Sequence, residues 1–166
     1  MTKYLTFFLT VWVGLMLSAC GGVHNTVTKL PEGLEVIKVA TIAPIEVISK
    51  EQNPDALALN AQWKKMAGEE LQSLLANKKI ATAKNAQAII VCRINAVYGN
   101  RALRWVAVEA GKGSFEVKIE LQDKDGNVRY ATASKADLSM GVFGGDMSKV
   151  AREAIQTAVK EFGSRL

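Results

Sequence analysis

The chain has 166 residues, of which 49% are hydrophobic and 22% charged, with a formal net charge of +5. These values are typical of one folded domain and exclude an intrinsically disordered chain. The basic residues are scattered rather than clustered, so we expect no nucleic-acid partner.

Residues 1–19 have the pattern of a secretion signal. Lys3 precedes an apolar run over residues 4–17, and Ser18 and Ala19 supply small residues at its end. As a helix this run would span about 21 Å, short of the roughly 30 Å hydrocarbon core of a bilayer. The pattern therefore predicts a cleaved signal peptide and not a membrane span.

Cys20 follows this signal directly, and residues 17–20, Leu-Ser-Ala-Cys, resemble the lipobox of bacterial lipoproteins. The resemblance implies that the thiol of Cys20 takes a diacylglyceryl group, and that a further fatty acid such as palmitate acylates its amine after cleavage. Two or three acyl chains give stable membrane anchoring without a transmembrane helix. The alternatives are an ordinary signal peptide with a chance cysteine, or a buried helix.

The residue after the cysteine bears on location. In bacterial lipoproteins, aspartate at this place often retains the protein in the inner membrane, whereas this chain has Gly21. The resemblance therefore implies an outer-membrane lipoprotein on the periplasmic side, with the inner membrane as the alternative. Residues 20–33 contain few large apolar side chains and predict a flexible tether, with a reach of about 20 Å. We expect a single domain over residues 34–166.

The first half of this domain predicts a strand and a helix. Residues 34–48 are rich in Val and Ile, which favours a buried strand, broken near Pro44. Asn53 is placed to cap a helix with Pro54 in its first turn, and helical spacing of apolar residues continues to residues 77–79.

The second half predicts three strands and a final helix. Residues 88–98 are apolar on both faces at first, which suits a central strand, and residues 114–122 alternate apolar and polar. Residues 123–126 predict a hairpin turn before a partner strand over 128–138, and Asp146 or Ser148 is placed to cap the last helix. The expected fold is α+β, a two-layer sandwich of a mostly antiparallel four-stranded sheet with two helices on one face, in the order β-α-β-β-β-α.

Residues for catalysis are scarce. The only histidine, His24, lies in the predicted tether, so it is poorly placed to activate a nucleophile, and Cys92 fits a small buried hydrophobe better than a reactive thiol. With Cys20 acylated, one Cys and one His remain for a zinc site that usually takes several. Glu116 and Glu120 share a strand face, but their Cα atoms would lie about 13 Å apart, beyond the roughly 9.5 Å of paired glycosidase carboxyls. We therefore expect no catalytic residue, metal or cofactor.

Two loop motifs also fail to support ligand binding. Residues 111–113, Gly-Lys-Gly, lack the earlier glycine and the following Ser or Thr of a phosphate-binding loop. Residues 123–126, Asp-Lys-Asp-Gly, lack the remaining acidic ligands of a calcium loop, so turn formation explains them better.

A partner-binding surface is the remaining candidate. Arg101, Arg104 and Trp105 combine two cations with an aromatic, and Phe143 lies in a glycine-rich stretch that ends at Asp146 before the last helix. The free amides of a helix N-terminus could hold an anion there. The alternative is that Trp105 and Phe143 cap the core while Asp146 occupies the amides.

These motifs resemble a family of bacterial envelope lipoproteins that is catalogued only as a domain of unknown function. The resemblance covers roughly residues 101–162 and rests on an Arg-x-x-Arg-aromatic segment, Gly111, the Asp123 to Gly126 turn, and the Gly-x-Phe-Gly-Gly-Asp stretch over residues 141–146. Members of the family often have glycine where Val108 or Glu109 stands in this chain. The resemblance implies an envelope lipoprotein and no particular activity.

Three functions are therefore open at the level of the sequence. The first is a lipid-anchored, non-enzymatic protein that binds an envelope protein through the residues around Trp105 and Phe143. The second is a periplasmic cell-wall hydrolase or another carboxylate-dependent enzyme. The third is a structural subunit of an envelope assembly.

Overall fold

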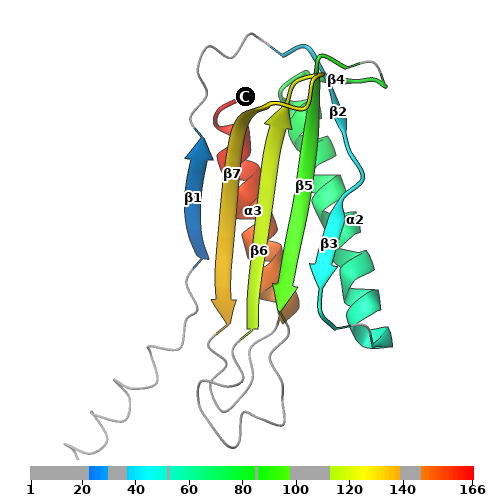
Figure 1. Cartoon of the computed structure of the whole chain (residues 1–166), viewed down its shortest axis with the longest axis vertical. Coiled ribbons are helices and arrows are strands. Elements are labelled where there is room, and N and C mark those ends of the chain that lie inside the picture. Colours follow the sequence, from blue (N-terminus) through cyan, green and yellow to red (C-terminus); the bar gives the residue numbers. More distant parts are fainter. Residues whose placement is uncertain (1–22, 30–36, 52, 85, 98–112, 139–146) are drawn as a thin grey trace, which may run out of the picture.

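The computed structural model describes residues 23–29, 37–51, 53–84, 86–97, 113–138 and 147–166. Within these ranges the chain forms an α+β fold with two helices and one mixed sheet (Figure 1). The strands are β1 (Val23–Lys29), β2 (Val39–Ile42), β3 (Glu46–Ser49), β4 (Ala81–Thr82), β5 (Ala88–Val97), β6 (Gly113–Gln122) and β7 (Val128–Leu138), and the helices are α2 (Pro54–Asn77) and α3 (Met147–Gly163).

The sheet is larger and less antiparallel than the sequence predicts. Seven strands pair in the order β1-β7-β6-β5-β2-β4, with β3 also against β5. The pairs β1·β7, β7·β6 and β6·β5 are antiparallel, as expected for the last three strands, whereas β2 and β3 run parallel to β5 and β4 runs parallel to β2. The prediction of four strands in a mostly antiparallel sheet is therefore only partly correct.

The Val- and Ile-rich stretch over residues 34–48 contains two short strands, with the expected interruption at Pro44. Pro44 has no amide hydrogen to give to a sheet, and β2 ends before it at Ile42. Ala43, just before the proline, donates its amide to the carbonyl of Ile90 at 2.9 Å. The chain therefore stays beside β5 across the break, and β3 resumes the pairing at Glu46.

Strand β1 is the largest departure from the expected structure. Residues 23–29 fall within the predicted tether, yet they pair antiparallel with β7, from Val23 opposite Ala136 to Lys29 opposite Ala131. Pairing satisfies backbone groups along the outer edge of β7. The prediction of a flexible tether is therefore wrong for residues 23–29, which are an edge strand of the sheet.

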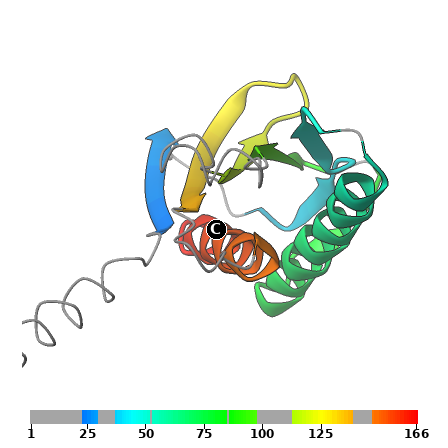
Figure 2. The same ribbon diagram turned by 90° about the horizontal axis from the view of Figure 1, so that it is seen from below.

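Both helices lie against one face of the sheet, and no described helix covers the opposite face, which we call the open face (Figure 2). Helix α2 begins as expected, because the Oδ1 atom of Asn53 accepts the amide of Ala56 at 2.9 Å and Pro54 follows. Helix α3 packs one apolar side against the core, and its buried residues include Ala151, Ile155 and Phe162. Neither described helix is long and apolar enough to cross a bilayer.

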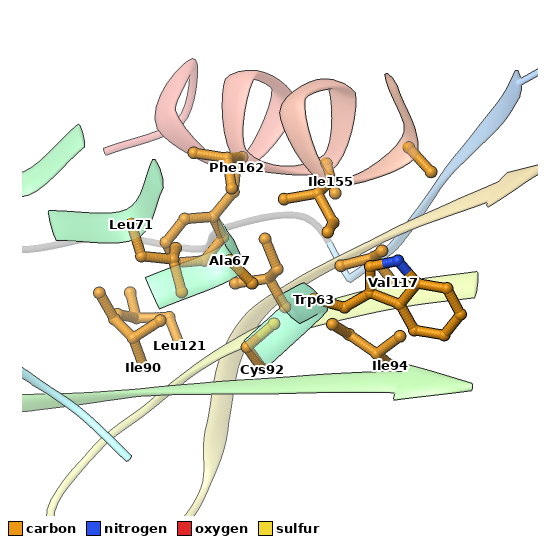
Figure 3. Close-up of a cluster of buried hydrophobic side chains, with 14 of the residues drawn as sticks. Trp63, Ala67, Leu71, Ile90, Cys92, Ile94, Val117, Leu121, Ile155 and Phe162 are labelled. Atoms are coloured by element: carbon orange, nitrogen blue, oxygen red, sulfur yellow. The ribbon is translucent and has the colours of Figure 1, made fainter. Parts of the chain in front are cut away.

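The core lies between the helices and the covered face of the sheet (Figure 3). Trp63 of α2 meets Phe115 of β6 edge to face, with ring centroids 4.9 Å apart, and Tyr130 of β7 stacks on Phe162 of α3 at 5.5 Å. Cys92 points into this core and is fully buried, which confirms its interpretation as a small hydrophobe.

The turn between β6 and β7 forms as predicted. Gly126 has a positive φ of 82°, a conformation that glycine adopts without steric cost. The carboxylate of Asp123 accepts the amides of Asn127 at 2.8 Å and Asp125 at 3.0 Å, and also pairs with Arg129. The Asn127 amide is the strongest of the interactions that lower the pKa of Asp123. This carboxylate is engaged in organising the turn.

Candidate functional site

The residues expected to act at the membrane or on a partner are Cys20, Arg101, Arg104, Trp105, Phe143 and Asp146, and all of them lie outside the described residues. The described residues nearest to them in the chain are Val23, Val97, Gly113, Leu138 and Met147.

The four of these residues that belong to strands lie at one end of the sheet, as the strand register shows. Val23 is opposite Ala136, which is opposite Phe115, and Phe115 is opposite Ala96. Ala96 in turn is paired with Ser49 of β3. These five residues form one row across the sheet, and we call this end of the molecule the Val23 end.

The Val23 end carries the exposed apolar surface of the described part of the chain. The large hydrophobic side chains that are strongly exposed there are Ile48 at 57%, Leu57 at 49% and Val97 at 45%. Ile48 is paired with Asn95, one row closer to the middle of the sheet than the row of Val23. Val97 is one row farther toward the end of the sheet, so Ile48 and Val97 are diagonal neighbours on the open face. Leu57 lies in the first turn of α2, which starts beside the end of β3 (Figure 1).

A charged cluster occupies the middle of the open face. The side chain of Glu120 is nearly buried, and one of its oxygens accepts hydrogen bonds from Arg93 at 3.2 Å and Gln122 at 2.8 Å. The other oxygen pairs with the ammonium of Lys118 at 2.8 Å, and Arg93 also reaches Glu46 at 3.4 Å. This cluster ties β3, β5 and β6 together.

Electrostatics show that Glu120 is held as a carboxylate. Burial by itself would raise the pKa of Glu120, but hydrogen bonds from Lys118 and Gln122 and the charges of Lys118 and Arg93 outweigh it. The resulting pKa lies below the ordinary value for glutamate. Because its oxygens are already engaged by three side chains, Glu120 has a structural role here. Glu116 likewise accepts a hydrogen bond from Asn95 at 3.2 Å.

Cys92 and His24 also lie within the described residues. Burial raises the pKa of the Cys92 thiol to about 12, so almost no thiolate forms at neutral pH. His24 is exposed on β1 opposite Lys135, and no group of His, Cys, Asp or Glu among the described residues is arranged to hold a metal ion.

No protein-family model matches this chain, and no curated protein is similar to it in sequence. Its fold is similar to that of PelC. A PelC L103M dodecamer from Paraburkholderia phytofirmans is 18% identical, with a TM-score of 0.52 over 89% of this chain and 100% of that one. A second PelC dodecamer structure from the same organism gives 18% identity and a TM-score of 0.50 over 84% and 96%. A minor lipoprotein from Acinetobacter baumannii is 13% identical with a TM-score of 0.35, over 78% and 92%.

Sequence reasoning missed the apolar surface at the Val23 end. Ile48 was assigned to a buried strand because of its neighbours, and Val97 to the end of a strand with two apolar faces. A signal was present, since Val47 and Ile48 cannot both face the core of a strand whose side chains alternate. Leu57 directly follows Ala56 in the first turn of α2, and Ala56 is buried whereas Leu57 is exposed.

Proposed function

We propose that this chain is a lipid-anchored protein of the bacterial outer membrane, held by acyl chains on Cys20 on the periplasmic side, and that it serves as a non-enzymatic assembly component of the envelope. The observation that carries the proposal is the position of Cys20, which directly follows the predicted secretion signal and precedes the first strand of the sheet by three residues. The resemblance of residues 101–162 to envelope lipoproteins supports the same class.

Self-association is part of this proposal. The fold is shared with PelC, which forms a dodecamer, and the match spans that whole chain. This chain also presents β1 as an edge strand whose outer side has no strand beside it among the described residues. Such an edge can pair with another copy. We propose that the functional form is a homo-oligomer, and that Arg101, Arg104, Trp105, Phe143 and Asp146 contact a further envelope protein.

Metabolic labelling with palmitate tests the anchor. The wild-type chain should take up label and fractionate with outer membranes, and Cys20→Ala should lose the label completely. Equal labelling of the two chains would refute acylation at Cys20.

Assembly is tested on the acylated protein in detergent by analytical ultracentrifugation over a hundredfold range of concentration. We expect a discrete species several times the mass of one chain. A monomer at every concentration would contradict the assembly function while leaving the anchor intact.

Crosslinking in cells tests the predicted contact residues. Photoreactive groups at positions 105 and 143 should capture an envelope protein that a matched probe at the exposed Gln72 of α2 does not capture. Identical capture from all three positions would argue against this surface.

A further inference from the structure

We propose that the Val23 end of the domain rests directly on the lipid surface, with Ile48, Leu57 and Val97 in the headgroup region of a zwitterionic leaflet. This inference depends on the proposed acylation of Cys20 and goes beyond it, because an acylated protein could equally well stand away from the membrane on a tether.

The length of chain between the lipid and the sheet sets the first constraint. Only Gly21 and Gly22 separate Cys20 from Val23, the first residue of β1. Three residue steps cover at most about 11 Å when fully extended. The polar layer of each leaflet is roughly 5–8 Å thick. With the acyl chains in the hydrocarbon core, the start of β1 must therefore lie in or just above the headgroups.

With the strands standing along the membrane normal, strand register shows which side chains lie at the depth of Val23. Val97 is one row beyond Val23 toward the anchor, and Ile48 is one row behind Val23. Both lie on the open face of the sheet, where no helix covers them (Figure 2). Leu57 adds a third apolar side chain from the adjacent start of α2. The exposed large hydrophobic residues of the described chain are therefore gathered at the end that the anchor holds near the membrane.

The opposite end of the domain has different chemistry. There the turn between β6 and β7 exposes Lys124, Asp125 and Asn127, and no large apolar side chain is strongly exposed among the described residues of that end. Single exposed apolar residues are common on protein surfaces. Their segregation to the anchored end is what points to a lipid surface.

Charges at the Val23 end favour a zwitterionic leaflet. The exposed carboxylates of Glu51, Asp55 and Asp137 are matched by the cations Lys50, Lys135 and Lys149, and Lys135 pairs with Asp137 at 3.4 Å. A surface on which the two signs balance can meet both the phosphate and the amine groups of zwitterionic lipids, and it gains no net Coulomb attraction from an anionic leaflet. Because the anchor already holds the domain at the membrane, three side chains suffice to orient it even though they would bind weakly alone.

The test uses the acylated full chain in phosphatidylcholine vesicles. Single cysteines at Ile48→Cys, Leu57→Cys and Val97→Cys receive an environment-sensitive fluorophore, while Cys20 is blocked by lipid and Cys92 is buried and almost entirely protonated. Matched probes at Thr82→Cys and Lys124→Cys report on the opposite end. A quencher attached to the lipid headgroup should reduce emission at least threefold at positions 48, 57 and 97, and by less than a tenth at positions 82 and 124.

A second experiment removes the three exposed apolar side chains that are proposed to contact the lipid. With the fluorophore at Lys50→Cys, the substitutions Ile48→Thr, Leu57→Gln and Val97→Thr together should at least halve the quenching. The control triple Ala81→Ser, Thr82→Gln and Ala83→Ser, at the opposite end, should leave it unchanged. Far-UV circular dichroism confirms that both variants are folded.

Other outcomes would separate the two proposals. An acylated chain that shows no quenching at the Val23 end would overturn this inference and leave the proposed anchor standing. A blue-shifted but unquenched probe would mean that a protein, including a second copy, covers this end. A chain without acyl groups would refute the proposed function itself.

Discussion

Glu120 shows how one side chain can join three strands on the open face of a sheet. Its carboxylate is 5% exposed and is satisfied by Arg93, Lys118 and Gln122, while Arg93 continues the network to Glu46. Since Arg93 and Lys118 remain partly exposed, loss of the carboxylate would leave neither cation buried without a partner. The cluster therefore stabilises the fold chiefly through charge-assisted hydrogen bonds.

Replacing this carboxylate should alter the pH dependence of stability. The pKa of Glu120 is lower in the folded protein than its ordinary value of 4.5, so its stabilising effect is present above that value and is lost as pH falls through the folded pKa. Glu120→Gln should cost about 2 kcal/mol at pH 7 and flatten the loss of stability as pH falls from 7 to below 4.5. Urea unfolding across this pH range measures both effects, with Glu116→Gln as the control. An unchanged acid slope in Glu120→Gln would contradict the assignment.

The sequence predicts the burial of a side chain when burial follows from strand alternation. It does not predict burial that depends on residues far away in the chain. Cys92 was correctly expected in the core, because it alternates with apolar residues on a single strand. Glu120 was expected in solvent by the same rule, but Arg93 and Lys118 cover it. The aliphatic stems of long cations can bury a carboxylate on an otherwise solvated face.

Strand β1 is the element that differs most from the structure expected from the sequence. It fills the outer edge of β7, and Val27, opposite Thr132, packs against the core, whereas Thr26, opposite Ala133, is exposed on the open face. Adjacent residues of one strand thus face opposite sides. This alternation offers a matched pair of positions for testing whether β1 is a stable part of the sheet.

Val27→Asp should loosen β1, because it places a charge where an apolar side chain meets the core. We expect a loss of about 1–2 kcal/mol and faster hydrogen exchange in the amides of β1 and the adjacent edge of β7. Thr26→Asp should have little effect, since its side chain is exposed to water. Equal effects of the two substitutions would show that β1 does not pack as described.

The start of α2 is a second local feature with a measurable contribution. Asn53→Ala removes the side-chain acceptor of the Ala56 amide and should cost about 1 kcal/mol, a decrease of roughly 3 °C in Tm. Asn53→Ser retains a capping oxygen and should recover most of the loss. Calorimetry of the three chains measures the difference, and a serine variant as unstable as the alanine variant would exclude capping as the cause.

Elements with local signals were predicted well. Both helices have caps or apolar stripes within a single segment, and β5 to β7 follow one another with a recognisable turn. Strand β1 was missed because its partner β7 lies about a hundred residues away, and a polar edge strand resembles a linker in composition. The parallel pairing of β2 and β3 with β5 was missed for a similar reason, because α2 intervenes in the chain.

Over the whole molecule, one core connects the helices with the sheet. Trp63 and Phe115 link α2 to β6, and Tyr130 and Phe162 link β7 to α3. The apolar surface at the Val23 end, by contrast, emerges only when strand register brings Ile48 and Val97 together. Strand alternation signals that Val47 or Ile48 is exposed, but no local pattern determines the register, so the proximity of Ile48 and Val97 could not be predicted from the sequence.

A shared core predicts cooperative unfolding. The chain without acyl groups should unfold in urea in a single transition, with tryptophan fluorescence and far-UV circular dichroism giving the same midpoint. With Trp105 replaced by Phe, the fluorescence of the chain without its signal reports on Trp63 in the core, and circular dichroism reports mainly on α2 and α3. Two separate midpoints would show that the helices and the sheet do not unfold as one unit.

The pairing of β1 with β7 also has a mechanical consequence. A force between the membrane and the domain would enter at Val23 and act along the axis of β1, across hydrogen bonds that run perpendicular to it. Such a load shears several bonds at once instead of opening them one after another. An anchor attached to this strand would therefore resist detachment from the domain better than one attached to a loop.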